Sequence, residues 1–222
     1  MDNCGCSLTG KAVGDQLIVG GSSPPARCHG RVAKSPPGRL LTKPEWSKQL
    51  NDWHYLGATC CGVIFAWGHD EGCCVYNVPR SRMISRWFPG LKMVELSRMV
   101  GAPGHAYAMT SLMAESLREA KHRGFDVAVT YADPIQDHTG CVYKAGNWVS
   151  DGFSSNERVW FLDGKRISRK GMYSKHGTQA EVVIRGLYKD RLSIIPGFPK
   201  PRFLMGLTRA GRKAVAERYK NG

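Results

Sequence analysis

The stretch from residue 92 to residue 131 limits the fold of this chain more than any other part of its sequence. Residues 92–100 and 125–131 have the apolar, β-branched character of buried strands. Residues 105–123 are expected to form a helix, because five apolar side chains share one helical face: Met109, Leu112, Met113, Leu117 and Ala120. A strand, a helix and a strand with one loop at each joint predict a βαβ crossover between parallel strands.

The segments around this crossover predict further helices and strands. Thr42 and Glu45 have the spacing of a capping box, and an apolar helical face follows them and is expected to end around Trp53. Residues 60–67 and 73–78 predict two strands, which a hairpin turn at 68–72 joins. Short helices are expected around 140–147 and over 208–219. Between residue 165 and the last helix the sequence is basic and predicts irregular structure.

The domain organisation predicted from these patterns is simple. Residues 1–41 are rich in Gly, Ser and Pro and predict an irregular arm, with a short strand at 16–19 as the exception. Residues 42–222 are expected to form one catalytic domain with a basic C-terminal segment, since 222 residues suit a single domain better than two. The predicted fold class is a mixed α/β sandwich, in which helices flank a central mixed sheet.

The distribution of charge indicates a polyanionic partner. The chain has 32 Lys and Arg against 18 Asp and Glu, and residues 158–222 hold 16 of the former but only 4 of the latter. Cations along a phosphate backbone release condensed counterions, so this asymmetry favours nucleic-acid binding. The alternative is a solvated basic surface that keeps the protein in solution.

The cysteines and the apolar runs indicate the compartment. Four of the eight cysteines form two adjacent pairs in strand-like sequence, where Cys acts as a small buried hydrophobe, and this favours a reducing environment. Cys4, Cys6 and the Cys28-His29 pair do not have the spacing of a common zinc finger. There is no apolar run of 18 residues and no signal-peptide pattern, so we expect a soluble protein of the cytoplasm.

Three segments place reactive side chains at the ends of predicted elements. His54 and Tyr55 follow the first helix, and Asp133 follows the second strand of the crossover, where ligands bind in α/β sheets. Residues 98–104 join a strand to the long helix, and their glycines would let backbone amides approach an anion. Each segment also has a structural interpretation: a helix end, a plain strand-to-helix turn, and a turn that Asp133-Pro134 begins.

The longest specific pattern extends from Asp133 to Trp148 and reads D-P-x-x-x-H-T-G-x-x-Y-x-A-x-N-W. Glu-Leu-Ser-Arg at 95–98 precedes it, and Asp151-Gly152 follows it. Over roughly residues 54–195 the chain resembles the Mom family of phage DNA-modification proteins.

This resemblance implies a variant of the GCN5-related N-acetyltransferase fold and an enzyme that acts on double-stranded DNA. The implied reaction adds a carbamoylmethyl group to N6 of adenine and protects the DNA of a bacteriophage from restriction. An iron ion is implied as a cofactor, and four positions match the residues implicated in the family: His54, Tyr55, Asp133 and Tyr143. His54, Tyr55 and Asp133 are the expected metal ligands among them, since oxygen and nitrogen donors suit non-haem iron.

The chemistry of adenine sets the expected roles of these residues. The N6 amine is paired inside the duplex, so the enzyme must extrude the base into a pocket. Asp133 would hold or deprotonate N6 or bind a metal beside it, Tyr143 would donate a proton or bind the metal, and His54 would be a ligand or a base. Trp53 or Trp148 would either stack on the extruded base or simply pack in the core, and the structural alternative for Tyr143 is packing beside Trp148. Four cations of the basic segment are expected to grip phosphates: Arg166, Arg169, Lys170 and Lys175.

Two other functions fit parts of the sequence. A conventional acetyltransferase of this fold would bind acetyl-coenzyme A through Arg98, Gly101 and Gly104, but Pro103 occupies the last motif position and removes an amide donor. Acetyl-coenzyme A is therefore a doubtful donor, and the sequence does not identify another. The third possibility is a DNA-binding protein without catalytic activity.

Overall fold

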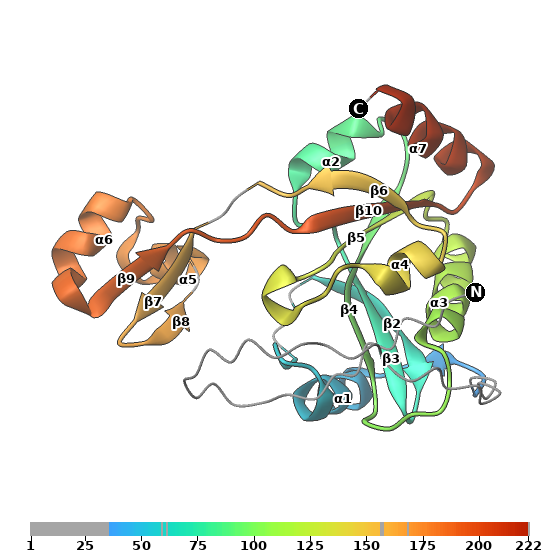
Figure 1. Ribbon diagram of the computed structural model, residues 1–222, viewed down its shortest axis with the longest axis horizontal. Coiled ribbons are helices and arrows are strands. Elements are labelled where there is room, and N and C mark those ends of the chain that lie inside the picture. The colour runs from blue at the N-terminus through green and yellow to red at the C-terminus, as the bar shows by residue number, and fades with distance from the viewer. Residues whose placement is uncertain (1–35, 59, 61, 156–157, 168, 222) are drawn as a thin grey trace, which may run out of the picture. The chain divides into compact units, whose positions relative to one another are not determined.

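The protein is described here from a computed structural model that covers residues 36–58, 60, 62–155, 158–167 and 169–221 (Figure 1). The chain divides into two compact units. The first unit holds the described residues up to Thr130, together with Gly140–Asp151 and the chain from Phe203 onward. The second unit holds Tyr131–Thr139 and Gly152–Arg202. Residues 42–222, which are expected from the sequence to form one domain, are thus divided between the two units.

A seven-stranded mixed sheet forms the framework of the first unit. Its strands lie in the order β1 (Arg39–Leu40), β2 (Val63–His69), β3 (Gly72–Asn77), β4 (Met93–Gly101), β5 (Val127–Tyr131), β10 (Pro201–Gly206) and β6 (Val149–Phe153). Strands β1 to β4 pair antiparallel, and β4 and β5 pair parallel from Met93↔Val127 to Leu96↔Thr130. The hairpin and the parallel βαβ crossover are therefore confirmed, and so is the mixed α/β fold class.

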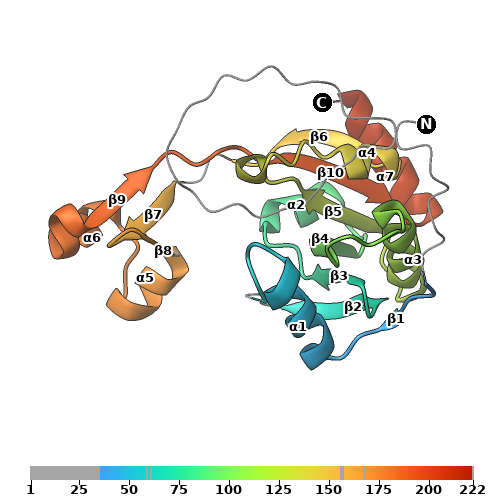
Figure 2. The ribbon, with the colours of Figure 1, turned by 60° about the horizontal axis from the view of Figure 1, so that its bottom comes forward.

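The helices of this unit are α1 (Lys43–Trp53), α2 (Arg82–Trp87), α3 (Met109–His122), α4 (Cys141–Ala145) and α7 (Arg209–Asn221). Helices α1 and α3 lie on opposite faces of the sheet (Figure 2). Because side chains alternate along a strand, Val75 of β3 packs with Leu50 of α1, whereas the neighbouring Tyr76 hydroxyl hydrogen-bonds Ser116 of α3 at 2.7 Å. The central strand β3 is buried throughout.

The local predictions hold where short-range chemistry decides the structure. The capping box at α1 is confirmed, because the Glu45 carboxylate accepts a hydrogen bond from the Thr42 backbone N–H at 2.6 Å. Cys73 and Cys74 are buried free thiols, as expected for small hydrophobes. Burial raises the pKa of the Cys74 thiol to about 12. In the described part of the chain, no helix is long and apolar enough to cross a membrane.

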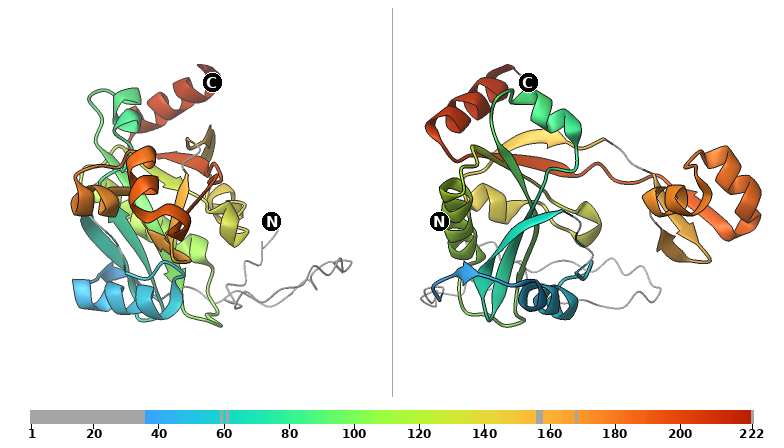
Figure 3. Two further views of the ribbon diagram at one scale, coloured as in Figure 1. Left: turned by 90° about the vertical axis from the view of Figure 1, so that its left-hand side faces the viewer. Right: turned by 180° about the vertical axis from the view of Figure 1, so that it is seen from behind.

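The second unit has its own core and corrects the prediction of irregular structure after residue 165. It contains β7 (Val159–Leu162), β8 (Lys165–Ile167), α5 (Arg169–His176), α6 (Glu181–Tyr188) and β9 (Leu192–Ile195). The strands form a separate sheet in the order β8-β7-β9, beside which the two helices lie (Figure 3). Four buried side chains, one from each of β7, α5, α6 and β9, form the core: Trp160, Met172, Ile184 and Leu192.

Two predicted boundaries move. The long helix α3 begins at Met109 rather than at residue 105, because the chain before it stays attached to the hairpin turn: the Ala102 N–H and the Tyr107 hydroxyl both donate to the Glu71 carbonyl, each at 2.7 Å. The arm predicted over 1–41 ends earlier, since residues 39–40 form β1 and the Leu41 N–H donates to the Ala66 carbonyl. The strand predicted at 16–19 and the cysteines before residue 30 lie outside the described residues.

Candidate active site

Asp133 lies two residues beyond the end of β5, at the start of a short 3-10 helix, Pro134–Gln136. Its main-chain carbonyl accepts hydrogen bonds from the Gln136 N–H at 3.1 Å and the His138 N–H at 3.2 Å, which closes the turn. The residue is only 5% exposed, and its Oδ2 atom lies 2.8 Å from Nζ of Lys200. A buried carboxylate requires a charged or hydrogen-bonding partner, and the Lys200 ammonium is such a partner for Asp133.

Lys200 is a residue of this site to which the sequence assigns no role. Two backbone interactions with Ser154 fix its position: the Ser154 N–H donates to the Lys200 carbonyl at 2.8 Å, and the Lys200 N–H donates to Ser154 Oγ at 2.9 Å. The carbonyl of the next residue, Pro201, accepts the Ala132 N–H at 3.0 Å. These hydrogen bonds therefore hold the chain segments of Asp133 and Lys200 next to each other. No local signal could have paired two residues that are 67 positions apart.

His138 belongs to the same unit, and the charges of Asp133 and Lys200 affect its pKa. Burial lowers its pKa, and the nearby Lys200 ammonium lowers it further, although Asp133 and Asp137 act in the opposite direction. The imidazole is therefore neutral near pH 7 and can accept a proton. The sequence pattern contains His138 without giving it a role.

Tyr143 lies on α4 in the first unit, between two aromatic rings. Its ring centroid is 5.7 Å from that of Trp148 and 5.3 Å from that of Phe203. Burial raises the pKa of the Tyr143 phenol, and a hydrogen bond with Thr130 opposes this shift. The Thr130 hydroxyl itself donates to the Leu96 carbonyl at 2.9 Å. A phenol with a raised pKa stays protonated at neutral pH, so Tyr143 is suited to donate a hydrogen bond.

His54 and Tyr55 lie together at the C-terminal end of α1. The His54 backbone N–H donates to the Leu50 carbonyl at 3.0 Å, and its Nδ1 atom accepts the Leu56 N–H at 3.1 Å. Its ring stacks on Tyr55 with a centroid distance of 4.7 Å. Because Nδ1 accepts the hydrogen bond from the Leu56 N–H, Nε2 carries the proton in the neutral ring and can act as a hydrogen-bond donor. Tyr55 is 44% exposed.

The predicted site residues are thus divided between the two units. Asp133 lies with Lys200 and His138 in the second unit, whereas His54, Tyr55 and Tyr143 belong to the first. Trp148 is buried and packs against Tyr143, so its packing role is the one that the structure supports. Trp53 packs against the α1 core, which also fits a packing role.

The predicted iron ligands were compared with the donors that the structure offers. The described residues contain no group of three or more His, Cys, Asp and Glu side chains that could hold a metal ion. One oxygen of Asp133 pairs with the Lys200 ammonium, which would compete with a cation. Iron stays a prediction from the resemblance.

The predicted coenzyme A loop, residues 98–104, offers few free amides. The Ala102 N–H donates to the Glu71 carbonyl, the His105 N–H donates to the Ala102 carbonyl at 3.1 Å, and Pro103 has no N–H. Gly104 has a positive φ of 76°, which favours glycine. Arg98 lies on β4 with its Nη1 atom bonded to the Ser97 carbonyl at 2.7 Å. This loop therefore lacks the row of donors that a pyrophosphate requires.

The predicted phosphate-binding residues all lie in the second unit. Arg166 is on β8, and Arg169, Lys170 and Lys175 are on α5. The Lys175 side chain is exposed, with its Nζ atom 3.1 Å from the Tyr188 hydroxyl. Residues 152–202 carry 11 Lys and Arg against 4 Asp and Glu. Two of these acids are paired with arginines, Asp163 with Arg191 and Glu181 with Arg185.

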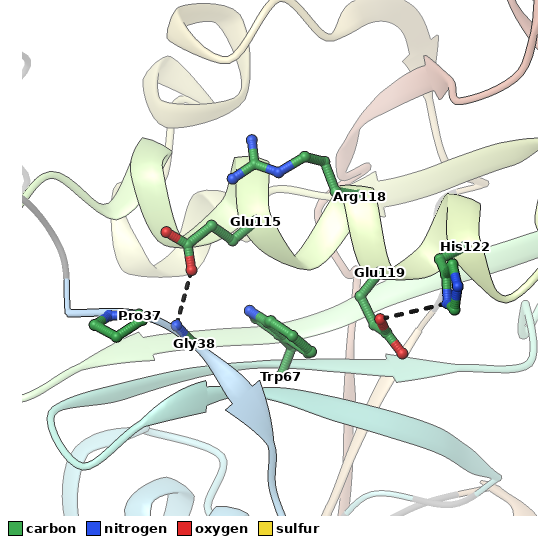
Figure 4. A pocket seen from close by; sticks show the side chains of 7 residues that line it. All are labelled: Pro37, Gly38, Trp67, Glu115, Arg118, Glu119 and His122. Atoms are coloured by element: carbon green, nitrogen blue, oxygen red, sulfur yellow. Dashed lines mark hydrogen bonds and ion pairs between the residues drawn. The ribbon is translucent and has the colours of Figure 1, made fainter.

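A hollow of about 480 Å³ lies along α3, but it contains none of the predicted site residues (Figure 4). Glu115 points across it and accepts the Gly38 N–H at 2.9 Å, while Trp67 forms its floor. The remaining lining residues on α3 are Arg118, Glu119 and His122. We do not assign it to the active site.

Comparison with known proteins gives a family. Residues 32–221 match the model of the Mom protein family. A search of curated proteins gave no match. Among solved structures, an N-acetyltransferase from Staphylococcus aureus Mu50 aligns at 12% identity and a TM-score of 0.42, over 78% of this chain and 98% of that one. Because the family model matches most of the sequence, including the whole run from Asp133 to Trp148, the chain belongs to the Mom family.

Proposed function

We propose that this protein is a transferase that adds a carbamoylmethyl group to N6 of adenine in double-stranded DNA and thereby protects phage DNA from restriction. The match to the Mom family supports DNA modification. One structural observation supports Asp133 as the catalytic residue. Its buried carboxylate pairs with Lys200 and follows the end of a strand, in a unit rich in cations. Loops beyond strand ends are where α/β proteins bind their ligands.

In the proposed reaction, Asp133 acts on the extruded adenine. Its carboxylate accepts a hydrogen bond from N6–H and takes that proton as the nitrogen lone pair attacks the methylene carbon of the donor. The new N–C bond forms as the bond from that carbon to the leaving group breaks, and the leaving group departs with the electron pair. The Lys200 ammonium pairs with the carboxylate and holds it in position before the proton is transferred. The donor is a carbamoylmethyl compound with a leaving group on the methylene.

The roles of the remaining residues rest on the resemblance. We propose that the neutral Tyr143 phenol donates a hydrogen bond to a reacting or leaving group and that His54 donates one through its Nε2–H, since its Nδ1 is an acceptor. The state of Tyr143 supports this role, because a raised pKa preserves the donor. Conventional use of acetyl-coenzyme A receives less support, since the amides of Ala102 and His105 already have acceptors within the chain. Calorimetry with acetyl-coenzyme A separates these two possibilities.

The most informative test of this function is the composition of DNA from bacteria that express the protein. We expect a new deoxyadenosine, heavier by one carbamoylmethyl group, in the digested nucleosides. A deoxyadenosine heavier by an acetyl group would support the conventional acetyltransferase instead. Unmodified nucleosides from cells in which the soluble protein binds DNA would support a binding protein without activity.

A further inference from the structure

Two phenylalanine side chains are exposed on the chain segments that hold the Asp133–Lys200 pair. Phe153 ends β6 and is 62% exposed, and Phe198 lies two residues before Lys200 and is 61% exposed. Single exposed apolar residues are common on protein surfaces. Two largely exposed aromatic residues on the segments that carry one ion pair are less easily explained by chance, because each keeps more than half of its surface in solvent.

Hydrogen bonds hold the backbone beside Phe153, and two prolines restrict the segment that carries Phe198. The residue after Phe153 is Ser154, which exchanges two hydrogen bonds with Lys200. The Arg202 Nη1 atom donates to the Phe153 carbonyl at 3.1 Å. Phe198 lies between Pro196 and Pro199, whose rings restrict the backbone. Lys200, which pairs with Asp133, therefore also helps to hold the chain beside Phe153.

The charge beside the rings indicates the class of partner. Lys200 and Arg202 lie on the same segment, within a region that carries 11 cations and 4 acids. Cations bind phosphates, and aromatic rings stack on nucleobases without regard to sequence. Apolar side chains that enter a base step unstack it and bend the duplex. Exposed rings flanked by cations thus match DNA better than an apolar protein surface.

We propose that Phe153 and Phe198 form an aromatic wedge that enters the DNA base stack beside the target adenine and promotes its extrusion toward Asp133. The two rings stack on the bases that the extruded adenine leaves, while cations of residues 152–202 bind the phosphate backbone of the DNA. This inference rests on the proposed function, because it assigns the extrusion step of that reaction to two side chains outside the catalytic group.

The test uses 2-aminopurine, an adenine analogue whose fluorescence rises when it leaves the base stack. The full-length protein is added to a set of duplexes that each carry one 2-aminopurine in a different sequence context. We expect a fluorescence rise with the wild-type protein. In the Phe153→Ala/Phe198→Ala variant the rise should fall about fivefold or more, because the stacking surface is gone. Its dissociation constant should change by no more than about threefold, because phosphate contacts supply most of the affinity.

Two controls separate a wedge from a damaged fold. Tyr219→Ala removes another exposed aromatic ring, 68% exposed on α7, and should leave the fluorescence rise unchanged. A duplex with 2-aminopurine opposite an abasic site needs little force to extrude the base, so the double variant should regain the signal there. A double variant with the wild-type signal on paired duplexes would overturn the proposal, and so would wild-type binding without any rise.

The outcome is independent of the chemistry, because the assay needs no donor. A fluorescence rise without modified adenine in cells would refute the proposed reaction and leave the wedge standing. Modified adenine together with an intact rise in the double variant would refute the wedge alone. A change in oligomeric state in the double variant with an intact rise would instead assign the rings to self-association.

Discussion

At the scale of single residues, the candidate site depends on one buried ion pair. The Asp133 side chain is 7% exposed and the Lys200 side chain 35%, at a separation of 2.8 Å. Removal of one partner of such a pair leaves an uncompensated charge, which costs more than the pair contributes. Lys200 therefore acts as a positioning residue through Asp133, and its removal should affect both stability and activity.

Substitution of Lys200 tests this dependence. We expect Lys200→Met to lower the free energy of unfolding by about 1–3 kcal/mol, less than for a fully buried pair because the lysine is partly exposed. The variant should also lose most adenine modification in cells. Lys200→Arg keeps the cation and should restore much of both properties. Urea unfolding and nucleoside mass spectrometry measure the two effects. A stable, fully active Lys200→Met variant would show that Asp133 does not need this partner.

The alkaline pH dependence tests the state of Tyr143. Burial raises the pKa of Tyr143 in the folded protein, so above pH 10 the unfolded chain releases a proton that the folded chain keeps. Stability should therefore fall as the pH rises beyond 10. Tyr143→Phe should make this fall shallower by up to about 1.4 kcal/mol per pH unit. Urea unfolding at several values between pH 8 and pH 11 measures the slope. Equal slopes for both proteins would show that the pKa of Tyr143 is not raised in the folded protein.

Sequence could identify only part of this site. Asp133 and Tyr143 stand in a recognisable pattern beyond a strand, so both could be proposed in advance. Lys200 could not, because it is one of 11 cations in its region and its partner lies 67 positions earlier. The exposed Phe153 and Phe198 carry no sequence signal either, since apolar residues are expected to be buried.

At the scale of helices and strands, the predictions succeeded where local periodicity decides the structure. The hairpin, the crossover and α1 have strong patterns and were predicted close to their observed positions. The short strands of the second unit were missed. A strand such as Lys165–Ile167 has three residues, two of them charged. The core of the second unit forms only when α5 and α6 supply Met172 and Ile184. Such a fold depends on tertiary contacts that a local pattern does not contain.

Glycine packing gives a prediction for α7. A Cβ atom at Gly211 would lie 1.9 Å from the Asp126 carbonyl oxygen, so the helix approaches the start of β5 closely there. We expect Gly211→Ala to destabilise the protein by about 1–3 kcal/mol through overpacking. A Cβ atom at Gly186 in α6 would meet no other atom within 4 Å, so this glycine serves as the matched control. Gly186→Ala should be stabilising by about 0.4–1 kcal/mol. Thermal unfolding of both variants checks this, and equal effects would contradict the proposed contact.

At the scale of the whole molecule, both units are basic, and the predicted phosphate contacts lie in the second. Residues 152–202 carry a large excess of cations, and the predicted phosphate contacts of Arg169, Lys170 and Lys175 lie on one helix, α5. This arrangement suits a substrate that is held by its backbone and read only locally. The basic C-terminal part of the sequence predicted a nucleic-acid partner, whereas its division between the two units at Arg202 and Phe203 was not visible in the sequence.

The salt dependence of DNA binding tests this arrangement. Each lost phosphate contact should make the slope of log K against log salt shallower by about 0.9. We expect the Arg169→Ala/Lys170→Ala/Lys175→Ala variant to reduce the slope by up to about 3, uniformly across DNA sequences. Lys43→Ala, an exposed cation on α1, is the control and should leave the slope unchanged. Fluorescence anisotropy over a salt series measures it, and an unchanged slope in the triple variant would exclude α5 from the interface.

The central claim is that the Asp133 carboxylate acts on the adenine amine, and one substitution tests it most directly. Asp133→Asn keeps the size of the side chain but removes the base, while Asp137→Asn changes an exposed carboxylate in the same turn, where asparagine tolerates the positive φ of 54°. Mass spectrometry of nucleosides from bacteria that express each variant gives the result. We predict that Asp133→Asn lowers the modified deoxyadenosine by about 10²–10⁴-fold with DNA binding intact, and that Asp137→Asn leaves it near the wild-type level. A folded Asp133→Asn protein that still modifies adenine at the wild-type level would contradict the account.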